Sequence, residues 1–543
     1  MKRLARAGRS SRAGSVSSAT TPIIVTGSLD PVVGEQPGGI VPRGQFAMSH
    51  PILRLDPMPH RLSKSRYTAG VQCHKLLWWK VHEPMAVELQ PGKVLQDRFD
   101  QGVQVGALAR DRFPGGVLVD LPHYAVDARI TMTRKLIDDG APAIFEASAL
   151  ADNTFVAVDV LTPGGDGFHL TEVKSSSSQK EEHLQDVAVQ IHVLERSGIH
   201  ITGADVMHLN KECRFPDLTN LFERTDVTEL VRPLINKVSW EIDKQSEMLD
   251  GPLPDIPIGL QCHEPYECPF MDRCWPKDPD HIMRLFNIGP KRGCNFLLTG
   301  VSRISELPAD QKLNATQKRQ IRAMQEQRII VESSLAKALE AFDCKLGFLD
   351  FETIQRAVPV WPGMAPWEQA PAQFSYHEAN GDGTYKHAEY LAEGPKDCRP
   401  ELAQRMVDAT RNAEKVVTYS GFEKTRIRGL QKAVPDLRTE LEALENKLID
   451  LLPVVRDNVY HPDFLGSFSL KYVLSPLVPE LTYDDLVIVD GLVASVEIAR
   501  LLFVAGKIPK EEHDRVRQDL LNYCERDTWA MVKVLEKLRE LAG

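Results

Sequence analysis

Two extended apolar segments, separated by a Pro-Gly-Gly-Asp-Gly turn, dominate the pattern of the first half of the chain. The first segment, residues 155–161, is interrupted by Asp159, and the second ends in Glu172-Val173-Lys174. Two such segments around a Gly-rich turn predict a β-hairpin. Because side chains alternate along a strand, Glu172 and Lys174 are expected on one face and Val173 on the other.

A helix is predicted directly after this hairpin. Residues 181–197 show helical periodicity, and Asp186 and Gln190 lie one turn apart within them. Charges inside an apolar strand are unfavourable unless they are paired or bind a metal. Two carboxylates and a lysine on one edge could hold a divalent ion beside a phosphodiester, whereas the alternative is an edge strand with a solvated face.

The second half contains another apolar strand with acids, residues 345–353. Its alternation places Asp350 and Glu352 on one face, opposite Leu349 and Phe351. Two carboxylates this close repel each other, so a shared cation is a natural reason for the arrangement.

Further polar side chains follow later elements of this half. A strand at residues 415–419 leads into Glu423 and a helix, and a final helix at residues 520–541 carries Tyr523 and Asp527 one turn apart. The order strand, strand, helix makes these residues candidates for one acidic site.

Four cysteines bracket the first half of the chain. Cys73 follows a predicted helix, and Cys262, Cys268 and Cys274 are spaced C-x5-C-x5-C in a Pro-rich loop. Shared coordination explains this spacing better than core packing does, and thiolates bind both iron–sulfur clusters and structural zinc. His263, next to Cys262, is interpreted as an exposed loop residue.

Composition narrows the class of protein. A chain of 543 residues is expected to hold two or three domains, and a net charge of −10 argues against a generally basic nucleic-acid binder. Nine cysteines, an odd number, do not suggest a secreted disulfide framework. We expect a cytoplasmic protein without membrane partners, since no apolar run approaches the length that spans a bilayer.

The hairpin and helix resemble the PD-(D/E)xK nuclease core of the RecB type. This resemblance implies that Asp159 and Glu172 bind Mg²⁺ or Mn²⁺ and that Lys174 is the catalytic lysine. It also matches Gln190 to the helix glutamine of RecB-like exonucleases and Glu146, one strand earlier, to an additional metal-binding acid. The cysteine layout is similar to that of RecB-family nucleases with an iron–sulfur cluster, which implies a 4Fe–4S cluster on the four cysteines, with zinc as the alternative.

The acids of the second half resemble the DEDD exonucleases of the ribonuclease-H-like fold, in their tyrosine subtype. By this resemblance Tyr523 orients water, and metal is bound by Asp350, Glu352 and Asp527. The sequence departs from the pattern at the second acid, where either Glu423 or Asp450 would supply the ligand.

The order of parts resembles a bacterial family that joins a RecB-type nuclease to a ribonuclease-H-like module. It predicts an α/β protein with a restriction-endonuclease-like domain, a helical connector and a ribonuclease-H-like domain. Within the connector, residues 285–307 resemble a helix-hairpin-helix, with a structural spacer as the alternative, and residues 316–341 are predicted as one helix. The expected parts are a disordered extension, whose Met48 is a candidate start, the nuclease domain, the connector and the C-terminal domain: residues 1–50, 51–280, 281–340 and 341–543.

These resemblances imply a metal-dependent nuclease, expected to be an exonuclease, that acts on nucleic acid, with single-stranded DNA or DNA ends favoured over RNA. By analogy, both DNA repair and defence against foreign DNA fit this activity. The alternative is a nucleic-acid-binding protein in which the C-terminal nuclease fold serves only for docking. A third possibility is a redox or iron-sensing regulator built on the cysteine cluster.

Overall fold

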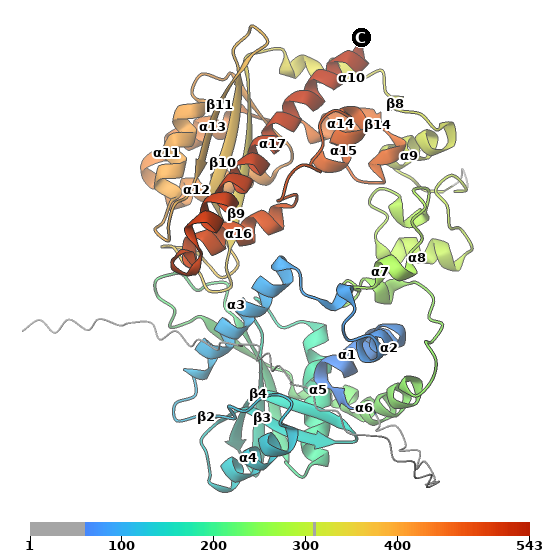
Figure 1. Ribbon diagram of the computed structural model, residues 1–543, viewed down its shortest axis with the longest axis vertical. Coiled ribbons are helices and arrows are strands. Elements are labelled where there is room, and N and C mark those ends of the chain that lie inside the picture. The colour runs from blue at the N-terminus through green and yellow to red at the C-terminus, as the bar shows by residue number, and fades with distance from the viewer. Residues whose placement is uncertain (1–59, 308–310) are drawn as a thin grey trace, which may run out of the picture. The chain divides into compact units, whose positions relative to one another are not determined.

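Two large β-sheets with covering helices organise the protein in the computed structural model, which describes residues 60–307 and 311–543 (Figure 1). Each sheet has its own hydrophobic core. The architecture is therefore mixed α/β, as predicted. The predictions for residues 1–50 and Met48 lie outside the described residues. None of the helices in the described ranges combines the length and apolar character that a membrane span requires.

The first sheet has seven strands in the order β2-β3-β4-β5-β6-β7, with β1 pairing alongside β4. The predicted hairpin is formed by β4 and β5, which pair antiparallel, and β5 then pairs parallel with β6. The helix α5 (Glu181–Arg196) connects these parallel strands. The strands are β1 (Leu62–Ser63), β2 (Val117–Leu118), β3 (Ile144–Ala151), β4 (Thr154–Gly164), β5 (Gly167–Val173), β6 (Ile201–Leu209) and β7 (Phe222–Asp226).

Helices position the ends of this sheet. The first, α1, is capped by Ser63, whose hydroxyl accepts a hydrogen bond from the Arg66 backbone N–H at 3.3 Å. The helical pattern of residues 95–112, with its small residues Gly102 and Gly106, predicts close packing at these glycines. This prediction was wrong: in the described residues, no heavy atom outside the local helix backbone lies within 4 Å of a Cβ placed at either glycine. The helices are α1 (Lys64–Gln72), α2 (His74–His82), α3 (Lys93–Arg110), α4 (Val126–Asp138) and α6 (Thr228–Leu249).

The second sheet has five strands in the order β11-β10-β9-β12-β13. Its central strand β9 pairs antiparallel with β10 and parallel with β12. The long helix α17 (Lys510–Ala542) packs against β9 and β10, and it begins earlier than the predicted helix. The strands are β9 (Leu346–Gln355), β10 (Gln369–Ala379), β11 (Tyr385–Leu391), β12 (Lys415–Thr418) and β13 (Leu448–Asp450).

Further helices complete this half of the protein. The helix α12 begins at the residue before Glu423, α13 packs against it, and α16 contacts both β9 and α17. The helices are α11 (Arg399–Thr410), α12 (Phe422–Ala433), α13 (Arg438–Lys447), α14 (Leu452–Asn458), α15 (Leu470–Leu477) and α16 (Gly491–Phe503).

The connector differs from its prediction in two places. Residues 285–307 contain a single helix, α8 (Pro290–Leu298), rather than the two of a helix-hairpin-helix. The helix predicted over residues 316–341 is divided into α9 (Ala315–Glu326), β8 (Ile330–Val331) and α10 (Leu335–Leu339). The division occurs because Gln327 adopts a left-handed backbone conformation and β8 then pairs with β14 (Val459–Tyr460), a long-range contact that the local pattern does not encode.

Candidate functional site

The hairpin and the following helix bring four of the predicted residues together. Glu172, on β5, forms an ion pair with Lys174 Nζ at 2.8 Å and accepts a hydrogen bond from Gln190 Nε2 at 2.7 Å. Asp159, on β4, accepts a hydrogen bond from the Val173 backbone N–H at 2.7 Å. The alternation of β5 and the helical spacing of α5 thus place two acids, the lysine and the glutamine in one site.

Two residues that were not predicted for this site complete its charge network. Lys64, on the first turn of α1, lies 2.7 Å from the same Glu172 oxygen that Lys174 contacts. Asp186, one turn before Gln190 on α5, pairs with Lys174 at 2.5 Å. Lys64 is separated from Glu172 by more than a hundred residues, so no local pattern connects them.

Burial and neighbouring charges shift the pKa values of Glu172 and Asp159 in opposite directions. Burial acts to raise the pKa of Glu172, but Lys174 and Lys64 outweigh it and hold that pKa below the ordinary value. Burial and the nearby Glu172 raise the pKa of Asp159 to about 7. The Asp159 carboxyl is therefore partly protonated near neutral pH, and a nearby cation would favour its charged form.

Glu146 does not join this hydrogen-bonded group. It lies on β3 between Phe145 and Ala147, which pair with Val160 and Val158 on β4, and its backbone adopts a φ of 59°. Its carboxylate forms an ion pair with Arg129 of α4 at 3.3 Å. The register of β3 and β4 places Glu146 opposite Asp159 on the neighbouring strand, but the Glu146 side chain is paired with Arg129.

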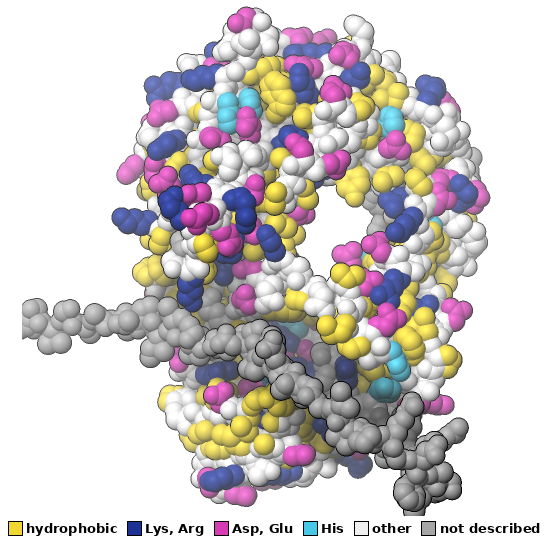
Figure 2. Space-filling model, viewed as in Figure 1, with side chains coloured by type: hydrophobic (Ala, Val, Ile, Leu, Met, Phe, Trp, Pro, Cys, Tyr) yellow, Lys and Arg dark blue, Asp and Glu magenta, His cyan; other side chains and the backbone are white. Residues whose placement is uncertain are grey.

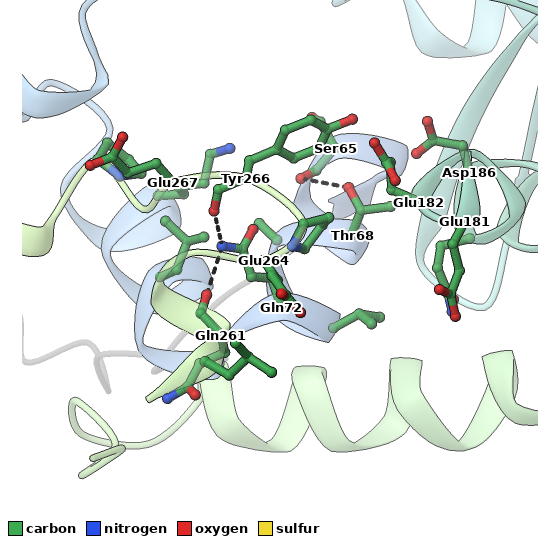
Figure 3. A pocket seen from close by; sticks show the side chains of 18 residues that line it. Ser65, Thr68, Gln72, Glu181, Glu182, Asp186, Gln261, Glu264, Tyr266 and Glu267 are labelled. Atoms are coloured by element: carbon green, nitrogen blue, oxygen red, sulfur yellow. Dashed lines mark hydrogen bonds between the residues drawn. The ribbon is translucent and has the colours of Figure 1, made fainter. Parts of the chain in front are cut away.

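A cavity of about 800 Å³ lies beside this group (Figure 3). It is bounded by α1, the start of α5 and the loop around Tyr266, and Asp186 belongs both to the cavity and to the lysine network. The Gln72 side-chain amide donates to the backbone carbonyls of Gln261 and Tyr266, at 2.8 and 2.7 Å, and so fixes the loop to α1 (Figure 3).

The cavity wall is rich in carboxylates, namely Glu181, Glu182, Asp186, Glu264 and Glu267. Carboxylates repel anions, so this wall disfavours a phosphate group and favours a cationic or neutral ligand. Elsewhere on the surface, Figure 2 shows basic, acidic and apolar side chains intermixed over the face in view.

The four predicted cysteines lie around one small cavity. Cys73 separates α1 from α2, Cys262 and Cys268 lie in the loop, and Cys274 ends the short helix α7 (Met271–Cys274). Burial, with the three neighbouring thiols contributing, raises the pKa of Cys268 to about 11. The free Cys268 thiol would therefore stay protonated at neutral pH, and a bound metal would favour its thiolate form.

Two polar atoms next to the cysteines are buried without a hydrogen-bond partner among the described residues: Trp275 Nε1 and His263 Nε2. The two rings contact each other edge to face at 5.3 Å between centroids. His263 is therefore partly buried, and the prediction that it is an exposed loop residue was wrong. The reason is its packing against Trp275, which directly follows Cys274.

The second sheet carries the other acidic site. Oxygen atoms of Asp350, Glu352 and Asp527 all lie within 4.8 Å of one another. Asp350 and Glu352 share a face of β9, and Asp527 reaches them from α17, which packs on that face. Three acids from distant parts of the sequence thus form one candidate metal site.

Glu423 and Asp450 occupy different positions relative to this site. Glu423 is buried and lines the same cavity as the three acids, and its Oε2 has no hydrogen-bond partner among the described residues. Asp450 accepts hydrogen bonds from the backbone N–H groups of Ser420 at 3.0 Å and Leu452 at 2.9 Å. Asp450 therefore caps a turn, and Glu423 is the better placed of the two to bind a metal.

Tyr523 and several residues that were not predicted surround the acids. Tyr523 lines the cavity, Tyr483 donates a hydrogen bond to Asp527, and Lys471 Nζ lies 4.9 Å from the Tyr523 ring centroid. A Cβ added to Gly491 would lie 3.6 Å from Glu352, so the backbone of α16 approaches that carboxylate closely. These contacts come from long-range packing, which the motif spacing alone does not reveal.

Burial and mutual repulsion keep these acids hard to ionise. Burial first, and Asp527 and Glu352 next, raise the pKa of Asp350 well above its ordinary value. Burial raises the pKa of Glu423 to about 8, with Asp450 and Asp527 adding to it. Lys471 opposes these effects at Glu352 and Asp527, yet the pKa values of both remain raised. A bound divalent cation would relieve this repulsion.

One known domain matches part of the chain. Residues 347–469 are similar to a domain of unknown function, DUF2779, and this segment contains Asp350, Glu352, Glu423 and Asp450 but not Tyr523 or Asp527. A search of curated proteins finds no significant match. The segment that is similar to this domain spans most of the second sheet, and the similarity assigns it no activity.

Proposed function

We propose that this protein is a divalent-metal-dependent nuclease with two active sites, one on each large sheet. The observation that carries the proposal is the acidic cluster of the second sheet, where oxygens of Asp350, Glu352 and Asp527 lie within 4.8 Å of one another. Buried carboxylates at this spacing are unfavourable without a counter-charge, and two-metal nucleases use such groups to hold their ions.

In the second site, Glu423 joins the three acids as a metal ligand. Its orphaned Oε2 and its position in the same cavity suit that role. Mg²⁺ or Mn²⁺ held by these four carboxylates would activate water and stabilise the leaving oxygen of a phosphodiester. Tyr523, which lines the cavity, would orient the attacking water, and Lys471 would place a positive charge near the substrate phosphate.

In the first site, Asp159 and Glu172 would hold the metal and Lys174 would face the reacting phosphate. The two lysines that now neutralise Glu172, at 2.7 and 2.8 Å, would be free to turn toward phosphate once a cation takes over that task. Gln190 keeps the Glu172 carboxylate in place through its 2.7 Å hydrogen bond. We infer the restriction-endonuclease-like and ribonuclease-H-like folds from these placements together with the strand orders.

The cysteines would bind a 4Fe–4S cluster rather than zinc. The four cysteines line one small cavity, and four cysteine thiolates are the usual ligands of such a cluster. The buried Trp275 N–H, without an acceptor, suits a nearby cluster sulfide.

The substrate that we favour is single-stranded DNA or a DNA end. The carboxylate-rich cavity beside the first site disfavours a phosphate backbone along its wall but accommodates an unpaired base, which the exposed Tyr266 ring could stack against.

The direct test is cleavage by the purified protein with Mg²⁺ or Mn²⁺, using end-labelled single-stranded and duplex DNA and RNA. Lys174→Ala is expected to silence the first site and Asp350→Asn the second, each by at least about a hundredfold. Lys211→Ala and Asp436→Asn, at exposed positions, serve as matched controls that keep full activity.

The outcomes distinguish the nuclease proposal from the alternative in which the C-terminal site only binds nucleic acid. Intact substrates of every type with both metals would refute the nuclease proposal. If Lys174→Ala removed all cleavage while Asp350→Asn changed only nucleic-acid binding, the C-terminal site would instead be a docking module.

A further inference from the structure

A third cluster of potential ligands lies on the second sheet, outside the acidic site. We propose that His377, His387 and Glu525 form a binding site for a transition-metal ion, with Zn²⁺ as the preferred class of ligand. One nitrogen of each histidine and one oxygen of the glutamate lie within 4.8 Å of one another. This inference does not depend on the proposed nuclease activity.

The topology of the sheet brings the two histidines together. His377 on β10 and His387 on β11 are directly opposite each other in the antiparallel register, so both side chains point to the same face. Their ring centroids are 4.5 Å apart. Glu525 reaches the pair from α17, with its carboxylate 3.8 Å from His387 Nδ1.

Two hydroxyl groups already orient the rings. Thr528 Oγ1 is hydrogen-bonded to His377 Nδ1 at 2.9 Å, and Ser375 Oγ to His387 Nε2 at 3.0 Å. The two hydroxyls also contact each other at 2.8 Å. Each ring is thus held through one nitrogen, which leaves His377 Nε2 and His387 Nδ1 for a metal, the arrangement that metal-binding histidines commonly have.

The chemistry of the donors selects the ion. Two imidazoles and one carboxylate match zinc and other transition metals, whereas Mg²⁺ prefers oxygen ligands only. Burial and the adjacent His387 lower the pKa of His377 to about 4, so its ring is neutral at pH 7 and can donate a lone pair. Because the rings are stacked, the partly buried His387 ring has to turn about its hydrogen bond to Ser375 so that its Nδ1 and His377 Nε2 face one ion.

The site also has a mechanical consequence. Glu525 and Thr528 belong to the same helix as Tyr523 and Asp527 of the acidic site. A metal held by β10, β11 and α17 would tie this helix to two strands of the sheet. Zinc would therefore stabilise the helix that completes the acidic site without entering that site.

The test measures zinc bound per chain by equilibrium dialysis and metal analysis in the full-length protein, with iron content checked in every sample. His387→Ala and Glu525→Ala are each expected to lose one zinc per chain, or to bind it at least about tenfold more weakly. His123→Ala, an exposed histidine, is the matched control and keeps wild-type stoichiometry. Comparing variants in this way cancels zinc bound at the cysteines and at the acidic sites.

Two further measurements keep the result interpretable. Thr528→Val removes only the hydroxyl that orients His377, and it should weaken zinc binding by about 10- to 100-fold. Co²⁺ should give visible d–d bands that disappear in His387→Gln, a variant that preserves side-chain size if alanine disturbs folding. Equal zinc stoichiometry and affinity in the wild type, His387→Gln and Glu525→Ala would overturn the proposal, whatever the outcome for nuclease activity.

Discussion

The substitution Glu423→Gln tests whether the acidic site of the second sheet is built for a cation. The side chain is 3% exposed, and its pKa is raised from 4.5 to about 8. When the pKa of a carboxyl is higher in the folded protein than in the unfolded protein, its contribution to stability is fully present below the unfolded pKa. This contribution is lost as the pH rises through the folded pKa. Without metal, the wild-type protein should therefore lose stability between about pH 4.5 and pH 8.

The magnitude follows from this difference in pKa. The interval from 4.5 to about 8 corresponds to about 5 kcal/mol, at about 1.4 kcal/mol per pH unit. Asp527 and Asp450 share the repulsion and remain in the variant, so we expect less than half of this, roughly 2 kcal/mol. If the part of the protein built on the second sheet, about 200 residues, unfolds as one unit, this free energy corresponds to a change of about 4–8 °C in Tm.

The assay is thermal unfolding in EDTA from pH 5 to 8.5. The Tm of Glu423→Gln should approach or fall below that of the wild type at pH 5 and exceed it by about 4–8 °C at pH 8.5. Added Mg²⁺ should reverse this order at pH 8.5, because a cation stabilises the wild-type carboxylate and gains less from the amide. Glu480→Gln, at an exposed position, is the control and should follow the wild type throughout.

A difference between Glu423→Gln and the wild type that does not change with pH would refute this reasoning. It would mean that packing, rather than the charge of Glu423, determines the effect of the substitution. A shift of Tm by Mg²⁺ that is equal in both proteins would show that Glu423 does not contact the ion.

Three further predictions concern the site on the first sheet and the neighbouring cysteines. Because the pKa of Asp159 is about 7, Mg²⁺ affinity measured by calorimetry in the Asp350→Asn background should rise up to about tenfold per pH unit from pH 5 to 7 and then level off; an affinity independent of pH would contradict the role of Asp159. Lys64→Met should lower cleavage by the first site at least about tenfold while metal binding persists, and loss of both together would instead indicate misfolding around Glu172. Cys268→Ser should lose bound iron and lower the Tm of the protein, as followed by absorbance and metal analysis, and an unchanged iron content would exclude this cysteine as a ligand.

The local pattern of the sequence determines much of both candidate sites. Alternation along β5 and β9 places Glu172 with Lys174 and Asp350 with Glu352, because the period of a strand is fixed by its backbone. Helical spacing likewise brings Gln190 onto Glu172. These relations join residues close in sequence, so periodicity alone predicts them.

Tertiary packing alone decides the residues that arrive from elsewhere. Lys64 reaches Glu172 only because α1 begins beside the hairpin, and Tyr483 reaches Asp527 only because its loop folds against α17. The pairing of His377 with His387 depends on the register of β10 and β11. Such contacts depend on how separate elements dock, and no period within one segment specifies that.

The choice between Glu423 and Asp450 shows the same division. The sequence offered both acids for one position, because either could supply the second acid of the motif. The fold distinguishes the two acids. Asp450 accepts hydrogen bonds from backbone N–H groups, whereas the buried Glu423 Oε2 has no hydrogen-bond partner among the described residues. The sequence by itself determined which residue types could carry the chemistry, and the tertiary structure decided which carboxylate remains available, because hydrogen bonding and burial depend on the assembled surroundings of each side chain.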